Sequence, residues 1–442
     1  MNQPVSVAIE TRPPIYTSKR VLFYFITAAI GLSYILIMSQ WDYSLHISSG
    51  EMPEEMPGII GINNMQGALG KALLGTVGIV LLLLPSNYNR HYRVGPLFFF
   101  VGYLSLCYLS FIWSAHTEQT VRRLLVLGIY IVGILGTVRH LSSRQLLDSA
   151  IVVSLIIISL GLVVELNLGT FTPLQSSYRF TGTMHPNSQG SICAILVLAS
   201  YCRLRDDSNK WIFWATLFIG ILFLFLTKSR SNIFSCILAL YLSSFWNTSP
   251  RSKQLLFLLP FTFVCMSILT ISFSAPELLA RFDLLVNFGR DLDTADIFSL
   301  HGRIPLWVSL KDYILQRPLL GFGYHGFWTA DMMAFYKANI MTWANSGHSV
   351  IIDLLLQVGV IGTLLYGFSV LSVLYWVMKD CSFKGRPEDF FTFAILVQAI
   401  VLGLLESILL TPHTFGAFVT SVALFNCCII KENKSITEVP KY

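Results

Sequence analysis

The chain has 442 residues, of which 54% are hydrophobic and 12% are charged, and its mean hydropathy is +0.65. Soluble domains carry about 25% charged residues, so this balance excludes an ordinary soluble domain. The net charge of +6 is spread over short connectors, which favours a membrane protein over one that binds nucleic acid.

Apolar runs recur along the whole chain, and each is close to the roughly 20 residues that a helix needs to cross the hydrocarbon core. We therefore predict an all-α, polytopic integral membrane protein with about 12 transmembrane helices, forming a single membrane domain over residues 1–442. The predicted spans are residues 21–39, 66–84, 94–112, 121–138, 146–166, 188–202, 211–227, 230–247, 254–273, 348–378, 390–410 and 413–430. No small-residue cleavage site follows the first run, which predicts a retained span.

Basic residues mark alternate connectors, and the positive-inside rule places these connectors and both termini in the cytoplasm. The first external connector, residues 40–65, has no Lys or Arg. The longest external segment, residues 274–347, then lies between the ninth and tenth spans. The eight cysteines fall in spans or internal connectors, so no structural disulfide is expected.

The external segment contains one helical pattern, with apolar residues at Leu306, Leu310 and Ile314 and with Trp307 beside them. This pattern predicts an amphipathic helix that could lie on the membrane face. Pro318 ends it, and GFGYHGF follows as a tight aromatic turn.

Ionisable residues within spans are costly and by default mark a functional site. Such residues fall toward the outer ends of the predicted helices. They are Lys71, Arg122, Arg123, Glu165, Lys228, Arg230, Asp353 and Glu406. Snorkelling to the interface would explain any single one, such as Lys71 or Arg122. Their gathering on one side predicts a polar cavity at the outer leaflet.

Three basic residues could carry chemistry in that cavity. Arg230 stands with Lys228 at the start of the eighth span, where helix amides also favour anions, and Arg303 precedes the amphipathic helix. Guanidinium groups bind phosphate bidentately. His348, just before the tenth span, could take a proton from a sugar hydroxyl near neutral pH. Alternatively, Arg230 could be an interfacial anchor, Arg303 a solvated loop charge and His348 a packing residue at a helix end.

Two further patterns are weaker. His185 precedes Pro186 and Asn187, a turn whose polar groups would simply cap the sixth span. Asp291 and Asp293 imitate the metal-binding pair of some sugar-nucleotide transferases, but a solvated acidic loop explains them equally. No metal site or cofactor is therefore predicted.

Several short motifs occur in an order that resembles the O-antigen ligase and polymerase superfamily. The most specific is His348-Ser349, a nine-residue spacer and then GVIG. Further matches are Trp113-Ser114 followed by Arg122 and Arg123, Ser229-Arg230-Ser231, Gly302-Arg303 with Trp307, and RPLLGFGYHGFW. The FGRD at 288–291 and Glu406-Ser407 are more similar to the motifs of exopolysaccharide polymerases than to those of lipid A–core ligases. The residues between Asp291 and His301 look like an insertion, and Pro186-Asn187 replaces the family's lysine-asparagine pair.

The resemblance implies an inverting, metal-independent glycosyltransferase of the GT-C type in the bacterial inner membrane, with its active site facing the periplasm. It implies a donor oligosaccharide on undecaprenyl pyrophosphate and a growing polysaccharide as acceptor, with a chain-length regulator as a further partner. The family's roles fall on His348 as the base and on Arg230 and Arg303 as pyrophosphate ligands. Lys228, Arg122 and Glu406 are additional substrate-binding candidates.

Two alternatives remain at this point. A ligase would transfer the finished glycan to a lipid A–core or another acceptor. A transporter or flippase for lipid-linked sugars would belong to another class, but transporters place ionisable residues and broken helices near the midplane. The sequence predicts neither feature.

Overall fold

The computed structural model describes residues 15–39, 57–86, 88–175, 178–205, 210–244, 303–340, 346–383, 385–407 and 412–433. The helices are α1 (Ile15–Met38), α3 (Pro57–Leu83), α4 (Val94–Leu109), η1 (Ser110–Ile112), α5 (Thr117–His140), α6 (Ser143–Leu168), α7 (Pro186–Arg203), α8 (Lys210–Leu226), α9 (Arg230–Ser244), α13 (Arg303–Gln316), α14 (Ala330–Asn339), α15 (Val350–Phe383), α16 (Pro387–Leu405) and α17 (Phe415–Cys428). The strands are β1 (Tyr88–Tyr92) and β2 (Ile429–Asn433). The all-α class is thus confirmed, with one short strand pair added.

Every predicted span except the ninth overlaps one of these helices. The ninth, residues 254–273, lies outside the described residues, as does most of the predicted external segment 274–347. Among the described residues, seven helices are long and apolar enough to cross a membrane. They are Arg20–Met38, Met65–Leu83, Val94–Ile112, Thr117–His140, Ser143–Leu168, Val350–Ser382 and Pro387–Leu405.

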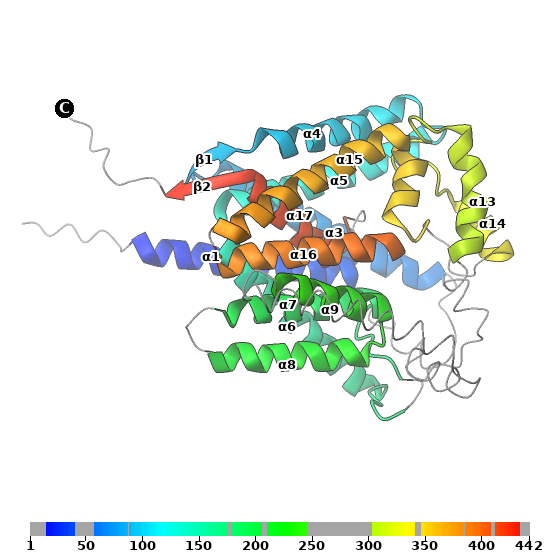
Figure 1. Cartoon of the computed structure of the whole chain (residues 1–442). Coiled ribbons are helices and arrows are strands. Elements are labelled where there is room, and N and C mark those ends of the chain that lie inside the picture. Colours follow the sequence, from blue (N-terminus) through cyan, green and yellow to red (C-terminus); the bar gives the residue numbers. More distant parts are fainter. Residues whose placement is uncertain are drawn as a thin grey trace, which may run out of the picture.

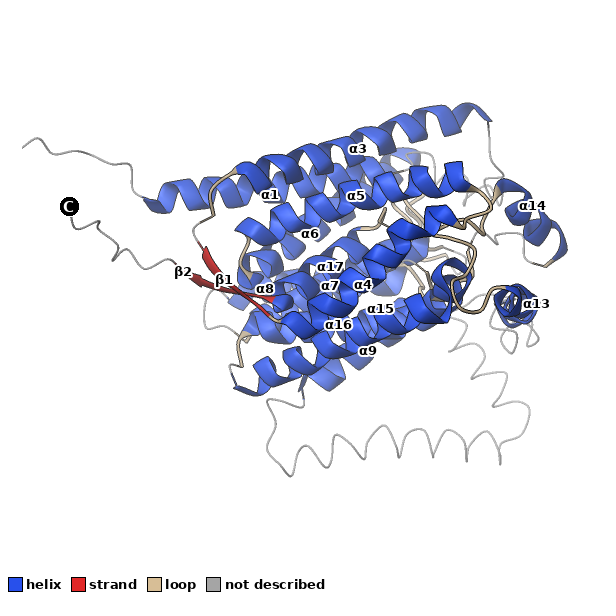
Figure 2. Ribbon diagram, turned by 90° about the horizontal axis from the view of Figure 1, so that it is seen from above, coloured by secondary structure: helices blue, strands red, loops and turns tan. Residues whose placement is uncertain are grey.

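The long helices run side by side in a bundle, with α13 and α14 at one end and the two strands at the other (Figures 1 and 2). We call these the α13 end and the strand end. The centre is α7, whose residues are almost all buried, and it packs against α6, α8, α9 and α16. Since α7 carries no charged residue before Arg203, it can be enclosed on every side without burying an unpaired charge.

Small residues bring two of the helices into backbone contact. A Cβ added at Gly78 in α3 would lie 2.7 Å from the carbonyl oxygen of Val132 in α5, and one at Gly136 would lie 2.6 Å from that of Gly78. Glycines at such positions allow close helix packing where lipid gives no hydrophobic driving force. The relative height of α3 and α5 is therefore closely fixed.

The strand end is closed by the antiparallel pair β1–β2, which sets Tyr88 opposite Asn433 and Tyr92 opposite Ile429. Next to it, the Arg93 guanidinium lies 2.8 Å from the Asp380 carboxylate and 4.6 Å over the Trp376 ring. These contacts tie the start of α4 to α15.

The tenth predicted span is broken, which the sequence did not indicate. Gly359 inside α15 has φ 64° and ψ −167°, and a Cβ there would lie 2.3 Å from the Leu319 carbonyl oxygen. The helix opens so that the turn after α13 can pair with it: the Phe322 amide donates to Leu356 O at 2.7 Å and the Val360 amide donates to Pro318 O at 2.8 Å. The prediction of one continuous span over residues 348–378 is wrong at this position.

The amphipathic helix is present as α13, but its predicted apolar face turns toward the protein. Leu306 and Leu310 are fully buried in a small core with Phe327, Trp328 and Tyr336. Other apolar residues of α13 are exposed, such as Val308 and Leu315. Cys107, Cys193, Cys202, Cys236, Cys381, Cys427 and Cys428 are all free.

Candidate active site

A buried carboxylate, Glu406, collects side chains from three other segments at the α13 end. It follows α16 directly, and its side chain is 7% exposed. Its Oε1 accepts hydrogen bonds from Arg303 Nη2 at 2.7 Å and from Asn187 Nδ2 at 2.9 Å. Its Oε2 lies 3.9 Å from Nδ1 of His348. The starts of α7, α13 and α15 therefore converge on the end of α16.

The charge state of Glu406 follows from these contacts. Burial acts to raise the pKa of its carboxyl, but the contact with His348 and the charge of Arg303 outweigh burial and leave the pKa below its ordinary value. Glu406 is thus a carboxylate at neutral pH. It can hold Arg303 in place and stabilise a positive charge on the His348 ring.

The backbone of His348 is held in an unusual conformation, with φ at 47°. Residues other than glycine seldom adopt this left-handed region, and such strain gathers at functional sites. The preceding residue is fixed on both sides: the Gly347 amide donates to Asp353 Oδ1 at 2.9 Å, and Trp307 Nε1 donates to Gly347 O at 2.8 Å. These bonds determine where the imidazole points.

Asp353 connects the two segments that carry His348 and Glu406. Besides the Gly347 amide, its carboxylate accepts hydrogen bonds from Trp328 Nε1 at 2.9 Å and from the Ser407 hydroxyl. Ser407 is the neighbour of Glu406. Asp353 therefore sets the position of His348 relative to Glu406 without contacting the imidazole ring or the Arg303 guanidinium.

Asn187 positions the start of α9. Its Oδ1 accepts from the Ser229 hydroxyl at 3.1 Å, and its carbonyl accepts from Asn232 Nδ2 at 2.8 Å. Arg230, the first residue of α9, lies between these two contacts in the sequence and is half-buried. Burial and the positive charge of Arg303 both act on the Arg230 guanidinium, so the two arginines lie in the same part of the molecule.

Lys228 belongs to the same turn, two residues before Arg230. It is half-buried and has a left-handed backbone, with φ at 51°. The turn is held by the Phe180 amide, which donates to Leu226 O at 2.8 Å, and by Arg179 Nε, which donates to Thr227 O at 3.1 Å. Lys228 thus adds a third cation beside α9.

Arg122 is not brought to this cluster. Its side chain is 77% exposed and forms an ion pair with Glu118, one turn earlier on α5. His185 caps α7 as the capping alternative predicts, because its Nδ1 accepts from the Asn187 amide at 3.1 Å.

Sequence reasoning missed the roles of Asn187, Trp307 and Trp328. Asn187 was interpreted only as part of a capping turn, although it reaches Glu406 and α9 together. Both tryptophans lie in the motifs quoted above. A buried indole N–H usually needs a hydrogen-bond partner, and this need was the signal that could have indicated their roles.

The cluster is suited to an anion. Arg230, Arg303 and Lys228 supply three cations, and Nε of Arg303 is buried with no hydrogen-bond partner among the described residues. No group of three or more metal-ligating side chains is found in the described ranges. The pair Asp291 and Asp293 lies outside them.

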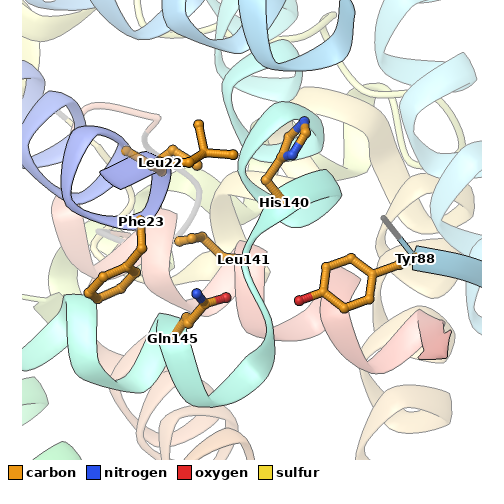
Figure 3. A pocket seen from close by; sticks show the side chains of 7 residues that line it. Leu22, Phe23, Tyr88, His140, Leu141 and Gln145 are labelled. Carbon is orange, nitrogen blue, oxygen red and sulfur yellow. The ribbon is translucent and has the colours of Figure 1, made fainter. Parts of the chain in front are cut away.

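A small cavity occurs elsewhere, at the strand end (Figure 3). It has a volume of about 40 Å³ and is lined by Tyr88 and Gln145, with Leu22, Phe23, Ile26, His140 and Leu141 around them. Figure 3 shows the Tyr88 ring and the Gln145 amide on facing sides. Such a volume has room for no more than a few waters, so it does not fit a sugar.

Comparison with known proteins gives two matches. Residues 215–367 match the family model described as O-antigen ligase, a range that contains Arg230, Arg303 and His348. A general O-oligosaccharyltransferase of Acinetobacter baylyi is 24% identical over 248 residues, which cover 54% of this chain and 42% of that protein. The chain therefore matches less than half the length of this relative. Both matches confirm the resemblance of this chain to the O-antigen ligase and polymerase superfamily that was drawn from the motifs.

Proposed function

We propose that the chain is a membrane glycosyltransferase that joins oligosaccharide repeat units carried on undecaprenyl pyrophosphate. One observation carries the proposal: Glu406 joins an anion-binding arginine to a histidine, with 2.7 Å to Arg303 Nη2 and 3.9 Å to His348 Nδ1. Glycosyl transfer from a pyrophosphate needs both a base for the acceptor and a cation for the leaving group.

The reaction is a single displacement with inversion. His348 removes the proton from an acceptor sugar hydroxyl, and that oxygen forms a bond to the anomeric carbon of the donor. The bond between this carbon and the phosphate oxygen breaks, and its electron pair leaves with the lipid pyrophosphate. The proton stays on the imidazole, next to the Glu406 carboxylate, and is then released to solvent.

Arg230 and Arg303 stabilise the departing pyrophosphate, with Lys228 as a supporting charge. Guanidinium forks match phosphate oxygens and remain charged at physiological pH. The glycosyl–phosphate bond of the donor supplies the driving force and the lipid pyrophosphate is the leaving group, so the proposed reaction uses no cofactor or metal. The orientation follows the positive-inside rule, with the α13 end in the periplasm and the strand end in the cytoplasm of a bacterial inner membrane.

The matched relative favours a second candidate within the same class. Its printed name describes an oligosaccharyltransferase, and a ligase that passes glycan to a non-lipid acceptor would use the same base and the same arginines. The two functions differ only in the acceptor. Incubation with lipid-linked repeat units alone separates them, since only a polymerase lengthens the glycan without another acceptor.

The broken helix at Gly359 requires a test against transport. Transporters use such breaks to bind substrate, but here the freed backbone groups pair with the turn after α13. Proteoliposomes with labelled lipid-linked sugar distinguish the two activities. We expect new glycosidic bonds; translocation of label without bond formation would favour a flippase instead.

The catalytic assignment is tested with the purified full chain in proteoliposomes. His348→Ala should lower the rate of glycan transfer by about 10²- to 10⁴-fold. His91→Ala, an exposed histidine of β1, is the matched control and should keep the parent rate. Arg303→Lys keeps the charge but loses the fork, so it should weaken donor use. Unchanged transfer by His348→Ala would rule out this base.

A further inference from the structure

A second group of basic side chains lies at the α13 end, apart from the cluster around Glu406. Its members are Lys71 in α3, Arg123 in α5, His325 in the aromatic turn and His413 just before α17. They come from four separate segments of the chain. The proposed transfer uses none of them.

Close glycine packing sets Lys71 at about the height of Arg123. A Cβ at Gly75 would lie 3.0 Å from Ile129 Cγ2, and one at Gly78 would lie 2.7 Å from Val132 O. The two pairs have the same spacing, so α3 and α5 run parallel in a fixed register. Lys71, four residues before Gly75, is then level with Leu125, which is roughly 3 Å along the helix axis from Arg123.

The last helix brings His413 to the same height. Both α5 and α17 run from the α13 end to the strand end (Figure 1). Tyr130 and Ser421 join them, with 3.0 Å between the two hydroxyl oxygens. Arg123 lies two turns before Tyr130, and His413 lies a similar distance before Ser421.

His325 is held over the start of α5. Gln119 Nε2 donates to His325 O at 3.1 Å and to Trp328 O at 2.8 Å. Gln119 and Arg123 are four residues apart, so they occupy the same face of α5. The His325 backbone is left-handed, with φ at 51°, which is a costly conformation for a residue other than glycine.

The positive charge of this group is uncompensated within the part of the chain that the structure describes. No carboxylate there forms an ion pair or hydrogen bond with Lys71, Arg123, His325 or His413. The charges of Lys71 and Arg123 act on His413, whose Nδ1 is buried with no hydrogen-bond partner among the described residues. Burial, followed by these charges, lowers the pKa of His413 to about 3.

The surroundings fit a lipid-borne anion. Arg123 is exposed and Lys71 is half-buried. Apolar side chains on the same two helices are open to the membrane: Leu69 is 55% exposed and Leu125 is 66% exposed. A phosphate bound between Lys71 and Arg123 would therefore have its lipid chain beside an apolar surface.

We propose that Lys71, Arg123, His325 and His413 form a second phosphate site, which binds the pyrophosphate of the lipid-linked acceptor. The identity of the acceptor rests on the proposed function. Glu406 and His413 are seven residues apart, so their Cα atoms are separated by at most about 25 Å. Donor and acceptor lipids would thus dock within reach of each other, with their sugars meeting at His348.

The test counts bound lipid pyrophosphates. The full chain in phosphatidylcholine nanodiscs is titrated with labelled geranylgeranyl pyrophosphate, and two equivalents are expected. Arg123→Gln should weaken one of them about tenfold or more, and Arg303→Gln should weaken the other. Lys311→Gln removes an exposed cation at the same end and should retain both. Lys71→Gln provides an independent variant should Arg123→Gln fail to fold.

Two competitors identify the source of the phosphate. The acceptor assignment would be overturned if inorganic pyrophosphate or phosphatidylglycerol displaced the Arg123-dependent equivalent as effectively as the lipid pyrophosphate does. Two full equivalents in both Arg123→Gln and Lys71→Gln would also overturn it. Failure of the proposed transfer is recognised separately, because His348→Ala would then keep the parent activity while the binding stoichiometry stays measurable.

A kinetic readout supports the same assignment. Arg123→Gln should raise the KM for the acceptor several-fold and leave the KM for the donor unchanged, whereas Arg303→Gln should do the reverse. An equal rise in both constants for Arg123→Gln would contradict a separate acceptor site.

Discussion

Oε2 of Glu406 lies 3.9 Å from Nδ1 of His348, while the other oxygen of the same carboxylate is bonded to an arginine. The carboxylate therefore joins the proposed base to the proposed anion clamp. In the proposed transfer the imidazole gains a proton, and the leaving group beside Arg303 gains negative charge. The single side chain of Glu406 lies between these two places. This arrangement resembles the way a third group orients the histidine of a catalytic triad.

Replacing Glu406 with Gln should lower the rate of transfer at least about tenfold, but less than His348→Ala does. The amide keeps the size of the side chain but removes the charge that stabilises the imidazolium. Initial rates measured at saturating donor test this. A rate equal to that of the parent chain would show that the charge of Glu406 is not needed for transfer.

Trp307→Phe removes one hydrogen bond, that from Nε1 to Gly347 O at 2.8 Å. The cost in stability should be about 0.5–1.5 kcal/mol. The rate should fall more than this cost implies, because the backbone that aims His348 loses one of its two restraints. Thermal unfolding and kcat measured on the same preparation test this, and Trp376→Phe at the strand end is the control for kcat.

Gly359→Ala should destabilise the protein by roughly 2 kcal/mol or more, since the new Cβ meets the Leu319 carbonyl and φ is 64°. Gly367→Ala in the same helix is the matched control. Nothing lies within 4 Å of a Cβ there, so helix propensity should leave stability unchanged or slightly raised. Thermal midpoints in detergent compare the pair, and equal midpoints would refute the break as a structural requirement.

Acid should weaken the fold through the second basic group. Burial and the charge of Arg123 lower the pKa of His325 to about 4, and His413 is lowered to about 3. The unfolded chain takes up these protons near pH 6.5, so the folded state loses stability as pH falls from about 6.5 toward 4. His413→Gln should reduce the fall in thermal midpoint between pH 7 and pH 5. His91→Gln, exposed in β1, should not.

The helices could be predicted because apolar length alone indicates a span, and every predicted span within the described residues falls on a helix. The break in α15 could not. Val358, Val360 and Ile361 read as one apolar run with Gly359, and the partner that opens the helix, the turn after Pro318, is distant in sequence. Only the tertiary approach of that turn makes glycine necessary there.

The candidate site was partly predictable. Basic residues and a histidine beside a span are conspicuous because charge is rare in such a chain, which is how His348, Arg230 and Arg303 were found. Glu406 was predicted only as a substrate-binding residue. Its contacts with basic side chains depend on how α13 and α16 pack together, which the sequence does not indicate. Arg123 and Arg122 are indistinguishable in sequence, but helix rotation gives them different neighbours.

The pairing of β1 with β2 bears on how the protein is made. β1 is synthesised more than 300 residues before β2, yet Tyr88 pairs with Asn433. Until β2 has been made, β1 presents an open strand edge. Chains truncated before Ile429 should therefore insert their helices but leave β1 unpaired, and should be more readily degraded than chains that contain β2.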